Sequence, residues 1–306
     1  RKRKEGKIMN NLDDLFDVQP KEGFGNEPFD VDAWAAKKQA ERQDAYNTAE
    51  AAALEISTDG DKFRNYLDVK ARFIQHSATN ALIIYAVSPQ ATEIRDFNGW
   101  KDLGASIKRD QKAIPILEPG DTYTREDGSI GTSWNVRKVF DISQTTARVR
   151  QRLPQRYDDR TLLTAMIGKS PVQVTGVDEL PDNMGAYYDH EQQVIFVRRG
   201  MEAHDIFRSL SKEIAHAELA GTNPDYNRRD AGFSAYCISY VIGKRYGIDV
   251  SAYDFSRMPE SFREADPKDI RAVLNEIGDV AKDVTGRMHR ELEKAKAPRT
   301  SDKERG

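Results

Sequence analysis

Cysteine, net charge and long apolar runs are scarce in this sequence of 306 residues. Its single cysteine, Cys237, excludes a disulfide framework and favours a reducing compartment, so we expect a cytoplasmic protein with this thiol buried as a small apolar group. No apolar run approaches the roughly 20 residues of a membrane-spanning helix. The basic start RKRKEGK precedes no apolar stretch, which argues against a secretory signal. The first residue is Arg1 rather than methionine, which is compatible with a fragment of a longer protein or a trimmed chain.

The charges that are present nearly cancel. The net charge is −3, and acidic and basic residues are interspersed rather than gathered in blocks. The totals therefore demand no nucleic-acid partner, although a local basic face stays open. Charged residues make up 32% of the chain and hydrophobic residues 38%, which is polar for a globular protein. We therefore expect about two domains with flexible ends.

One stretch has the frame of a metal-binding helix. In residues 206–220, IFRSLSKEIAHAELA, apolar residues recur at the spacing of one helical face. Its centre, KEIAH, matches the zinc-peptidase motif His-Glu-x-x-His with Lys212 in the first position, followed by Glu213 and His216. In the intact motif two histidines bind zinc and the glutamate activates the metal-bound water. A protonated lysine has no lone pair and repels a dication, so we expect this helix to have lost its zinc.

The remaining pattern predicts an α+β protein with short strands between helices. Asp127-Gly128 predicts a hairpin turn, and the apolar residues 81–87 favour a buried helix over a strand. The charged residues 147–160 contain a proline and predict a linker. Other predicted helices cover residues 32–57, 61–75, 161–167, 206–220, 231–246 and a last one from 267, with strands at 171–176, 185–189 and 193–198. The predicted parts are a flexible or helical extension (1–55), a small mixed α/β domain (56–150), a zincin-like domain (155–260) and a C-terminal helix with its tail (261–306).

Three segments resemble the ImmA/IrrE-type metallopeptidase-like domain: GAYYDHEQQVIFVRRG, SLSKEIAHAEL and AYCISYVIGKRYGIDVSAYDF, within roughly residues 155–256. The resemblance implies a strand, a hairpin, the motif helix and a second helix that carries a glutamate as third ligand. Tyr236 stands at that position. Two of the three implied ligands are therefore replaced, by Lys212 and Tyr236, while Glu213 and His216 are kept.

The upstream segment HSATNALIIYAVSPQATEIRDFNGWKDLGASIKRDQKAIPILEP, followed by KVFDISQT, resembles the N-terminal single-stranded-DNA-binding domain of ArdC-type antirestriction proteins. It is still more similar to the LtrC-like proteins of conjugative elements. That family combines the two modules in this order, so the resemblance covers roughly residues 55–256. Asp110 stands where the family usually has glycine in a Lys-x-Gly-x-Lys turn. Because aspartate tolerates a left-handed backbone, we expect the turn to form.

The front domain contains the residue types that hold unpaired nucleic acid. Such sites combine a basic groove with aromatic faces on which bases stack. From these types and the family's recurring motifs, the predicted DNA-binding residues are Arg72, Ser77, Asn80, Trp100, Lys101, Lys108, Arg109, Lys112, Arg137 and Lys138. Phe97, Tyr123 and Trp134 are further aromatic candidates. A place in the core is the alternative for both Trp100 and Trp134, and it is the better explanation for Trp134, which opens an alternating strand. The structural alternative for Ser77 and Asn80 is capping and turn formation.

The leading prediction is a non-enzymatic, single-stranded-DNA-binding protein of a conjugative or mobile element that serves DNA transfer or antirestriction. Its degenerate zincin domain would be a structural or protein-binding platform, with Lys212 paired to Glu213 or hydrogen-bonded to Tyr236. No catalytic residue, metal or other cofactor is expected, and the expected partners are single-stranded DNA and conjugation proteins, with no membrane. One alternative is a metal-dependent peptidase with an altered ligand set, zinc as cofactor and Glu213 as base. Another is a protein–protein adaptor.

Overall fold

The computed structural model of the protein describes residues 30–125, 127–147 and 157–296. The chain divides into two units, residues 1–37 and 38–306. Of the first unit only residues 30–37 are described, which begin helix α1 (Val31–Thr58). The predicted flexible start, most of the predicted linker and the C-terminal tail lie outside the described residues. Everything below concerns the second unit.

The front helices begin where polar side chains cap them. Asp59 accepts hydrogen bonds from two backbone N–H groups at the start of α2 (Gly60–Arg72), and Ser77 accepts one from Asn80 at the start of α3 (Ala78–Val87). The predicted helix over residues 81–87 is therefore confirmed. Lys70 lies on the buried face of α2 and is only 2% exposed. Its Nζ donates to the carbonyls of Ile74 and His76, and burial lowers its pKa to about 8.

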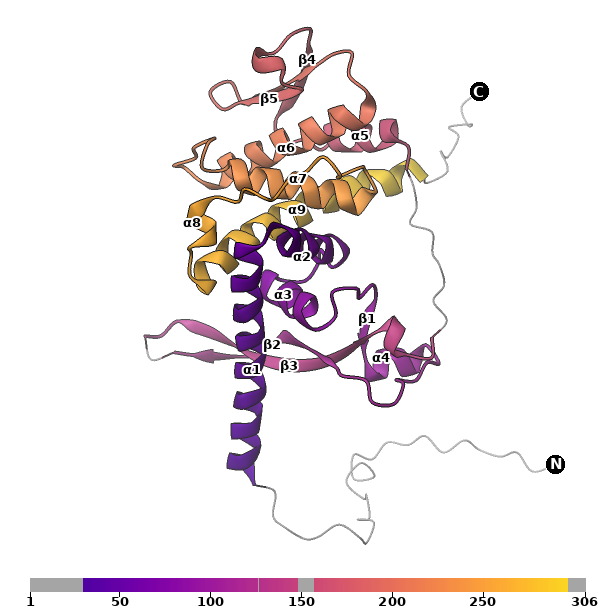
Figure 1. Ribbon diagram of the computed structural model, residues 1–306, viewed down its shortest axis with the longest axis vertical. Coiled ribbons are helices and arrows are strands. Elements are labelled where there is room, and N and C mark those ends of the chain that lie inside the picture. Colours follow the sequence, from indigo (N-terminus) through magenta and orange to yellow (C-terminus); the bar gives the residue numbers. More distant parts are fainter. Residues whose placement is uncertain (1–29, 126, 148–156, 297–306) are drawn as a thin grey trace, which may run out of the picture. The chain divides into compact units, whose positions relative to one another are not determined.

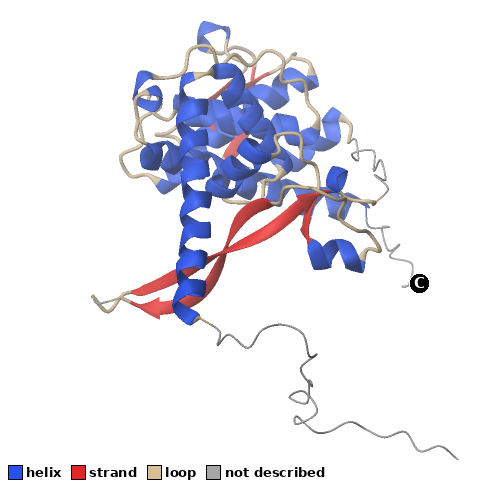
Figure 2. Ribbon diagram, turned by 60° about the horizontal axis from the view of Figure 1, so that its bottom comes forward, coloured by secondary structure: helices blue, strands red, loops and turns tan. Residues whose placement is uncertain are grey.

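The first sheet is a three-stranded antiparallel sheet in the order β1-β3-β2. It comprises β1 (Ile94–Asp96), β2 (Ile114–Thr124) and β3 (Ile130–Asp141), and the six-residue helix α4 (Phe97–Asp102) follows β1. Strands β2 and β3 form the long hairpin seen in Figure 2, whose predicted turn at Asp127-Gly128 is present with Gly128 at φ +81°. Trp134 on β3 is 41% exposed, so the prediction that it belongs to the core is wrong. The distal half of the hairpin extends beyond the residues that could bury it.

The second sheet is small and mixed. Helix α5 (Asp159–Ile167) precedes it in the chain. The sheet consists of β4 (Gln173–Val177), β5 (Ala186–Asp189) and β6 (Val194–Arg198), in the order β4-β6-β5. Strand β4 runs parallel to β6, and β5 runs antiparallel to it. Strand β5 also packs against α6 (Ala203–Thr222), the helix that carries the KEIAH segment. The predicted hairpin followed by the motif helix is therefore present.

Helices α6, α7 (Gly232–Tyr246) and α9 (Pro267–Lys296) pack side by side, as Figure 1 shows, and α8 (Glu260–Arg263) precedes α9. Gly247 caps the C-terminal end of α7, and its φ of +74° is the left-handed conformation that glycine adopts readily at this position. Helix α2 packs on α7, and α3 packs on β2 and α9, so one mixed α/β core is continuous through these elements. Cys237 is buried in it, as expected. No helix in the described ranges has the length and apolarity needed to cross a membrane.

Candidate functional site

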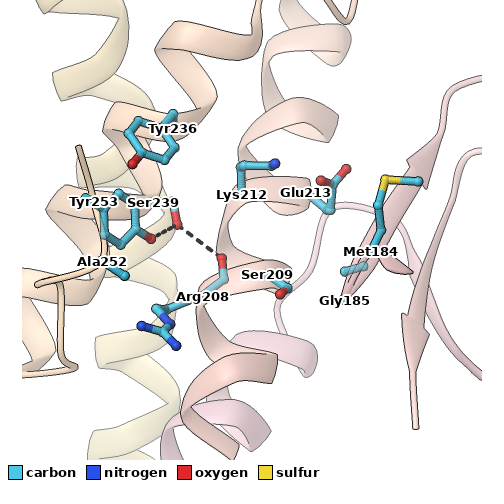
Figure 3. Close-up of a pocket in the computed structure, with 11 residues that line it drawn as sticks. Met184, Gly185, Arg208, Ser209, Lys212, Glu213, Tyr236, Ser239, Ala252 and Tyr253 are labelled. Atoms are coloured by element: carbon cyan, nitrogen blue, oxygen red, sulfur yellow. Dashed lines mark hydrogen bonds between the residues drawn. The ribbon is translucent and has the colours of Figure 1, made fainter. Parts of the chain in front are cut away.

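The KEIAH residues lie where α6 meets α7 and β5. Glu213 and His216 are buried on α6, and Lys212 is half-buried on the same helix. Tyr236 comes from the neighbouring helix α7 and lines the same cavity as Lys212. Figure 3 shows the Lys212 side chain between Tyr236 and Glu213. The structure thus brings together the four residues that the motif and the family resemblance singled out.

Glu213 is held by an arginine that the sequence did not point to. Its side chain is 1% exposed, and Oε2 accepts a 2.9 Å hydrogen bond from the backbone N–H of Tyr188 on β5. Arg228, from the loop between α6 and α7, donates through Nη2 to both carboxylate oxygens at 2.9 and 2.8 Å. The guanidinium also lies 4.6 Å from the ring centre of Tyr187. Glu213 is therefore paired with Arg228, and the predicted pair with Lys212 is wrong.

His216 is also engaged by this loop. The Tyr226 hydroxyl lies 3.0 Å from His216 Nδ1, and the two rings meet edge to face. Burial, with smaller contributions from the nearby Arg228 and Lys212 charges, lowers the pKa of His216 to about 3. Burial raises the pKa of Tyr226 to about 12. The pair is therefore a neutral imidazole beside a neutral phenol at ordinary pH.

Tyr236 is fixed by its surroundings rather than by Lys212. Its hydroxyl accepts a 2.8 Å hydrogen bond from the backbone N–H of Asp254, and its ring packs 4.8 Å from that of Tyr253. The predicted Lys212–Tyr236 hydrogen bond is not among its contacts. Within the described part of the chain, Lys212 forms neither a hydrogen bond nor an ion pair. Its side chain faces two cavities, of about 290 and 300 Å³.

Zinc, which the family resemblance implies, does not fit these side chains. Catalytic zinc is normally held by three protein ligands. Lys212 brings a cation, Glu213 is occupied by Arg228, and the Tyr236 oxygen already accepts a hydrogen bond. His216 keeps one ring nitrogen outside its contact with Tyr226. Consistently, the described residues contain no group of three or more His, Cys, Asp or Glu side chains placed to hold a metal.

Half of the predicted DNA-binding residues have structural roles. Ser77 caps α3, and the Asn80 side chain exchanges two 2.8 Å hydrogen bonds with the backbone of Leu117 on β2. Trp100 is 1% exposed and donates its indole N–H to the carbonyl of Phe140, so its ring faces are covered.

Two of the predicted arginines are occupied as well. Arg72 donates to the carbonyls of Pro89 and Ala91. Arg137 forms ion pairs with Asp96 and Glu118, which raise its pKa. The guanidinium N–H groups of Arg72 are therefore already engaged by carbonyl acceptors, and the charge of Arg137 is compensated by two carboxylates.

The other predicted cations are exposed. Lys101 lies in the last turn of α4, and Lys108, Arg109 and Lys112 lie on the loop that follows. Asp110 in this loop has φ +58°, which confirms the left-handed turn expected there. The loop is attached to the segment after β3, because Lys108 Nζ donates to the carbonyl of Ser143 at 2.8 Å and the Gln144 side chain donates to the carbonyl of Lys112 at 2.8 Å.

Exposed apolar side chains adjoin these cations. Phe97 and Leu103, at the two ends of α4, are each 59% exposed. We call the exposed Phe97, Lys101, Leu103, Lys108, Arg109 and Lys112 the α4 surface. Lys138, on β3, is 64% exposed with Nζ 3.6 Å from Glu41. Tyr123 on the hairpin is 52% exposed.

Sequence reasoning missed Arg228 and Tyr226. Both lie in the loop NPDYNRRD between α6 and α7, which carries a tyrosine and two arginines within a few residues. The only sequence signal for their role was that this cluster follows the motif helix, in which Glu213 lacks the metal-binding partners of the intact motif. The loop's backbone brings both side chains over α6, which residue spacing alone does not show.

No protein-family profile matches this sequence, and no curated protein matches it. Solved structures that resemble the fold include the antirestriction protein ArdC from plasmid R388, metal-free and with Mn(II) bound. The metal-free structure has 13% sequence identity and a TM-score of 0.47, over 72% of this chain and 86% of that chain. The Mn(II)-bound structure gives the same identity and score, over 71% and 85%. A likeness with a TM-score below 0.5 assigns neither a family nor a function to this chain.

Proposed function

We propose that the protein binds single-stranded DNA through the α4 surface and does not hydrolyse peptides. The observation that carries the proposal is the set of uncompensated cations there. Lys101, Arg109 and Lys112 are exposed, and none of them has an ion-pair partner among the described residues. Exposed Phe97 offers a ring on which a base can stack. Cations without acidic partners are free to neutralise phosphates.

The non-enzymatic part of the proposal rests on Glu213. A general base must reach the water it activates. Glu213 is instead buried, with both carboxylate oxygens accepting from Arg228 and one also from Tyr188. A role in DNA transfer or antirestriction for a mobile element is the finer proposal, and its support is the sequence resemblance of the front segment to ArdC-type and LtrC-like proteins.

The proposal is tested by fluorescence anisotropy with a labelled 20-mer of thymidylate at several salt concentrations. Replacing Lys101, Arg109 and Lys112 together by alanine is expected to weaken binding about tenfold or more. It should also flatten the dependence of log affinity on log salt by roughly 2, because each single-strand phosphate contact contributes about 0.7 to that slope.

A matched variant controls for total charge. Arg160, Lys268 and Arg290 are exposed cations elsewhere in the unit, and replacing these three by alanine removes the same charge. This variant should bind DNA nearly as the parent protein does. No binding by the parent at low salt, or equal losses in the two triple variants, would contradict the assignment to the α4 surface.

A further inference from the structure

The cavity between α6, α7 and β5 has a composition suited to a ligand. Its volume is about 290 Å³, at the small end of the range for ligand pockets. We call it the α6–α7 cavity. Its walls include Met184, Arg208, Lys212, Glu213, Tyr236 and Tyr253 (Figure 3). It therefore combines apolar and aromatic walls with a few charged groups.

Among the charged side chains that line the α6–α7 cavity, one positive charge is not compensated by an ion pair. Arg208 is paired with Asp205, and Glu213 is paired with Arg228. Lys212 is the remaining charged wall residue, and no described acceptor compensates its ammonium. The cavity thus presents one cation whose three N–H groups have no acceptor among the residues that the structure describes.

At Lys212 and Tyr236, the two positions where the family resemblance implies metal ligands, hydrogen-bond donors stand in place of lone-pair acceptors. Where the metallopeptidase pattern would bring lone pairs, Lys212 brings N–H groups. The Tyr236 oxygen already accepts from the backbone of Asp254, and burial raises the pKa of this phenol, so its hydroxyl proton is retained. Compared with the metallopeptidase pattern, these two positions therefore favour an anion rather than a metal cation.

We propose that the α6–α7 cavity binds a single carboxylate carried on an apolar or aromatic group, with the Lys212 ammonium as its counter-ion. One uncompensated cation matches one negative charge, and Glu213 in the wall opposes a second. Met184 and the rings of Tyr236 and Tyr253 provide apolar surface for the rest of the ligand. The proposal is independent of DNA binding, because its residues lie outside the α4 surface.

Isothermal titration calorimetry of the full chain with N-acetyl-L-phenylalanine tests the proposal directly. The matched probe is N-acetyl-L-phenylalanine amide, which has the same ring without the charge. The acid should bind at least tenfold more tightly than the amide. Equal affinity, or no binding of the acid, would overturn the proposal without any variant being needed.

Variants then test the role of Lys212. The substitution Lys212→Met should remove the preference for the acid, Lys212→Arg should keep most of it, and Lys268→Met, on the surface of α9, should leave it unchanged. Thermal melting checks that each variant is folded. An acid preference that survives in folded Lys212→Met would refute the assignment.

The source of the carboxylate is distinguished by two short peptides. One ends in phenylalanine with a free carboxylate, and the other has an amidated end and a glutamate beside phenylalanine. Tighter binding of the first indicates a chain terminus, and tighter binding of the second indicates an acidic side chain. Either result supports a carboxylate site, whereas binding of neither contradicts it.

Discussion

The pair between Arg228 and Glu213 gives the sharpest prediction for the site around Lys212. Replacing Arg228 by methionine removes the cation but leaves the Glu213 carboxylate 1% exposed, with only the Tyr188 N–H as donor. Breaking a buried ion pair by removing one partner costs about 3–5 kcal/mol. Because the Arg228 side chain is 33% exposed, we expect a smaller loss of about 2–3 kcal/mol. That corresponds to a melting temperature lower by roughly 5–10 °C.

The reverse substitution is the matched control. In Glu213→Gln the amide oxygen still accepts from Tyr188, and the partly exposed Arg228 can be hydrated, so the expected loss is about 1 kcal/mol. Thermal unfolding followed by circular dichroism compares the two variants with the parent protein. The reasoning is refuted if Arg228→Met melts within a degree or two of the parent, or no lower than Glu213→Gln.

Three further predictions concern buried polar groups. Below pH 6.5 the unfolded chain protonates His216, while the folded chain keeps it neutral down to about pH 3. As the pH falls between these two values, the free energy of unfolding should therefore drop by ~1.4 kcal/mol per pH unit. The free energy of unfolding of His216→Gln, measured by denaturation at several pH values, should not show this decrease. Lys70, with a pKa of about 8, stays protonated to higher pH in the unfolded chain, so parent stability should rise between pH 8 and 10 relative to Lys70→Met. A stability difference between the parent and Lys70→Met that stays constant from pH 8 to 10 would contradict this prediction. Asn80→Ala should lose ~2–3 kcal/mol by leaving the Leu117 backbone unpaired, and an unchanged melting temperature would argue otherwise.

Long helices with a clear apolar pattern or a clear end could be predicted from the sequence. The helix over 203–222 has apolar residues at helical spacing, and the helix over 232–246 is an apolar run whose end Gly247 marks. Helices α4 and α8 span six and four residues, which is too short for a helical period to be distinguished from a turn. Trp134 was misplaced because strand alternation shows which residues share a face, not whether anything covers that face.

The composition of the site could be predicted from the sequence, but its pairing could not. The KEIAH frame identified Lys212, Glu213 and His216, and the resemblance added Tyr236. Adjacent residues on a helix do not face each other, so Lys212 and Glu213 point in different directions and the carboxylate takes a partner from a loop. Loop residues such as Arg228 carry no periodic signal. Trp100 likewise met the compositional requirement for stacking but is used to close the fold around α4.

The central claim is that the positive charge of Lys212 and the ion pair between Glu213 and Arg228 keep a metal ion from binding where the family resemblance implies one. The most direct test is the zinc content of the purified protein after incubation with excess zinc and removal of unbound metal. The account predicts much less than one zinc per chain, with no difference between the parent protein and His216→Ala. One tightly held zinc per chain that is lost in His216→Ala would contradict it.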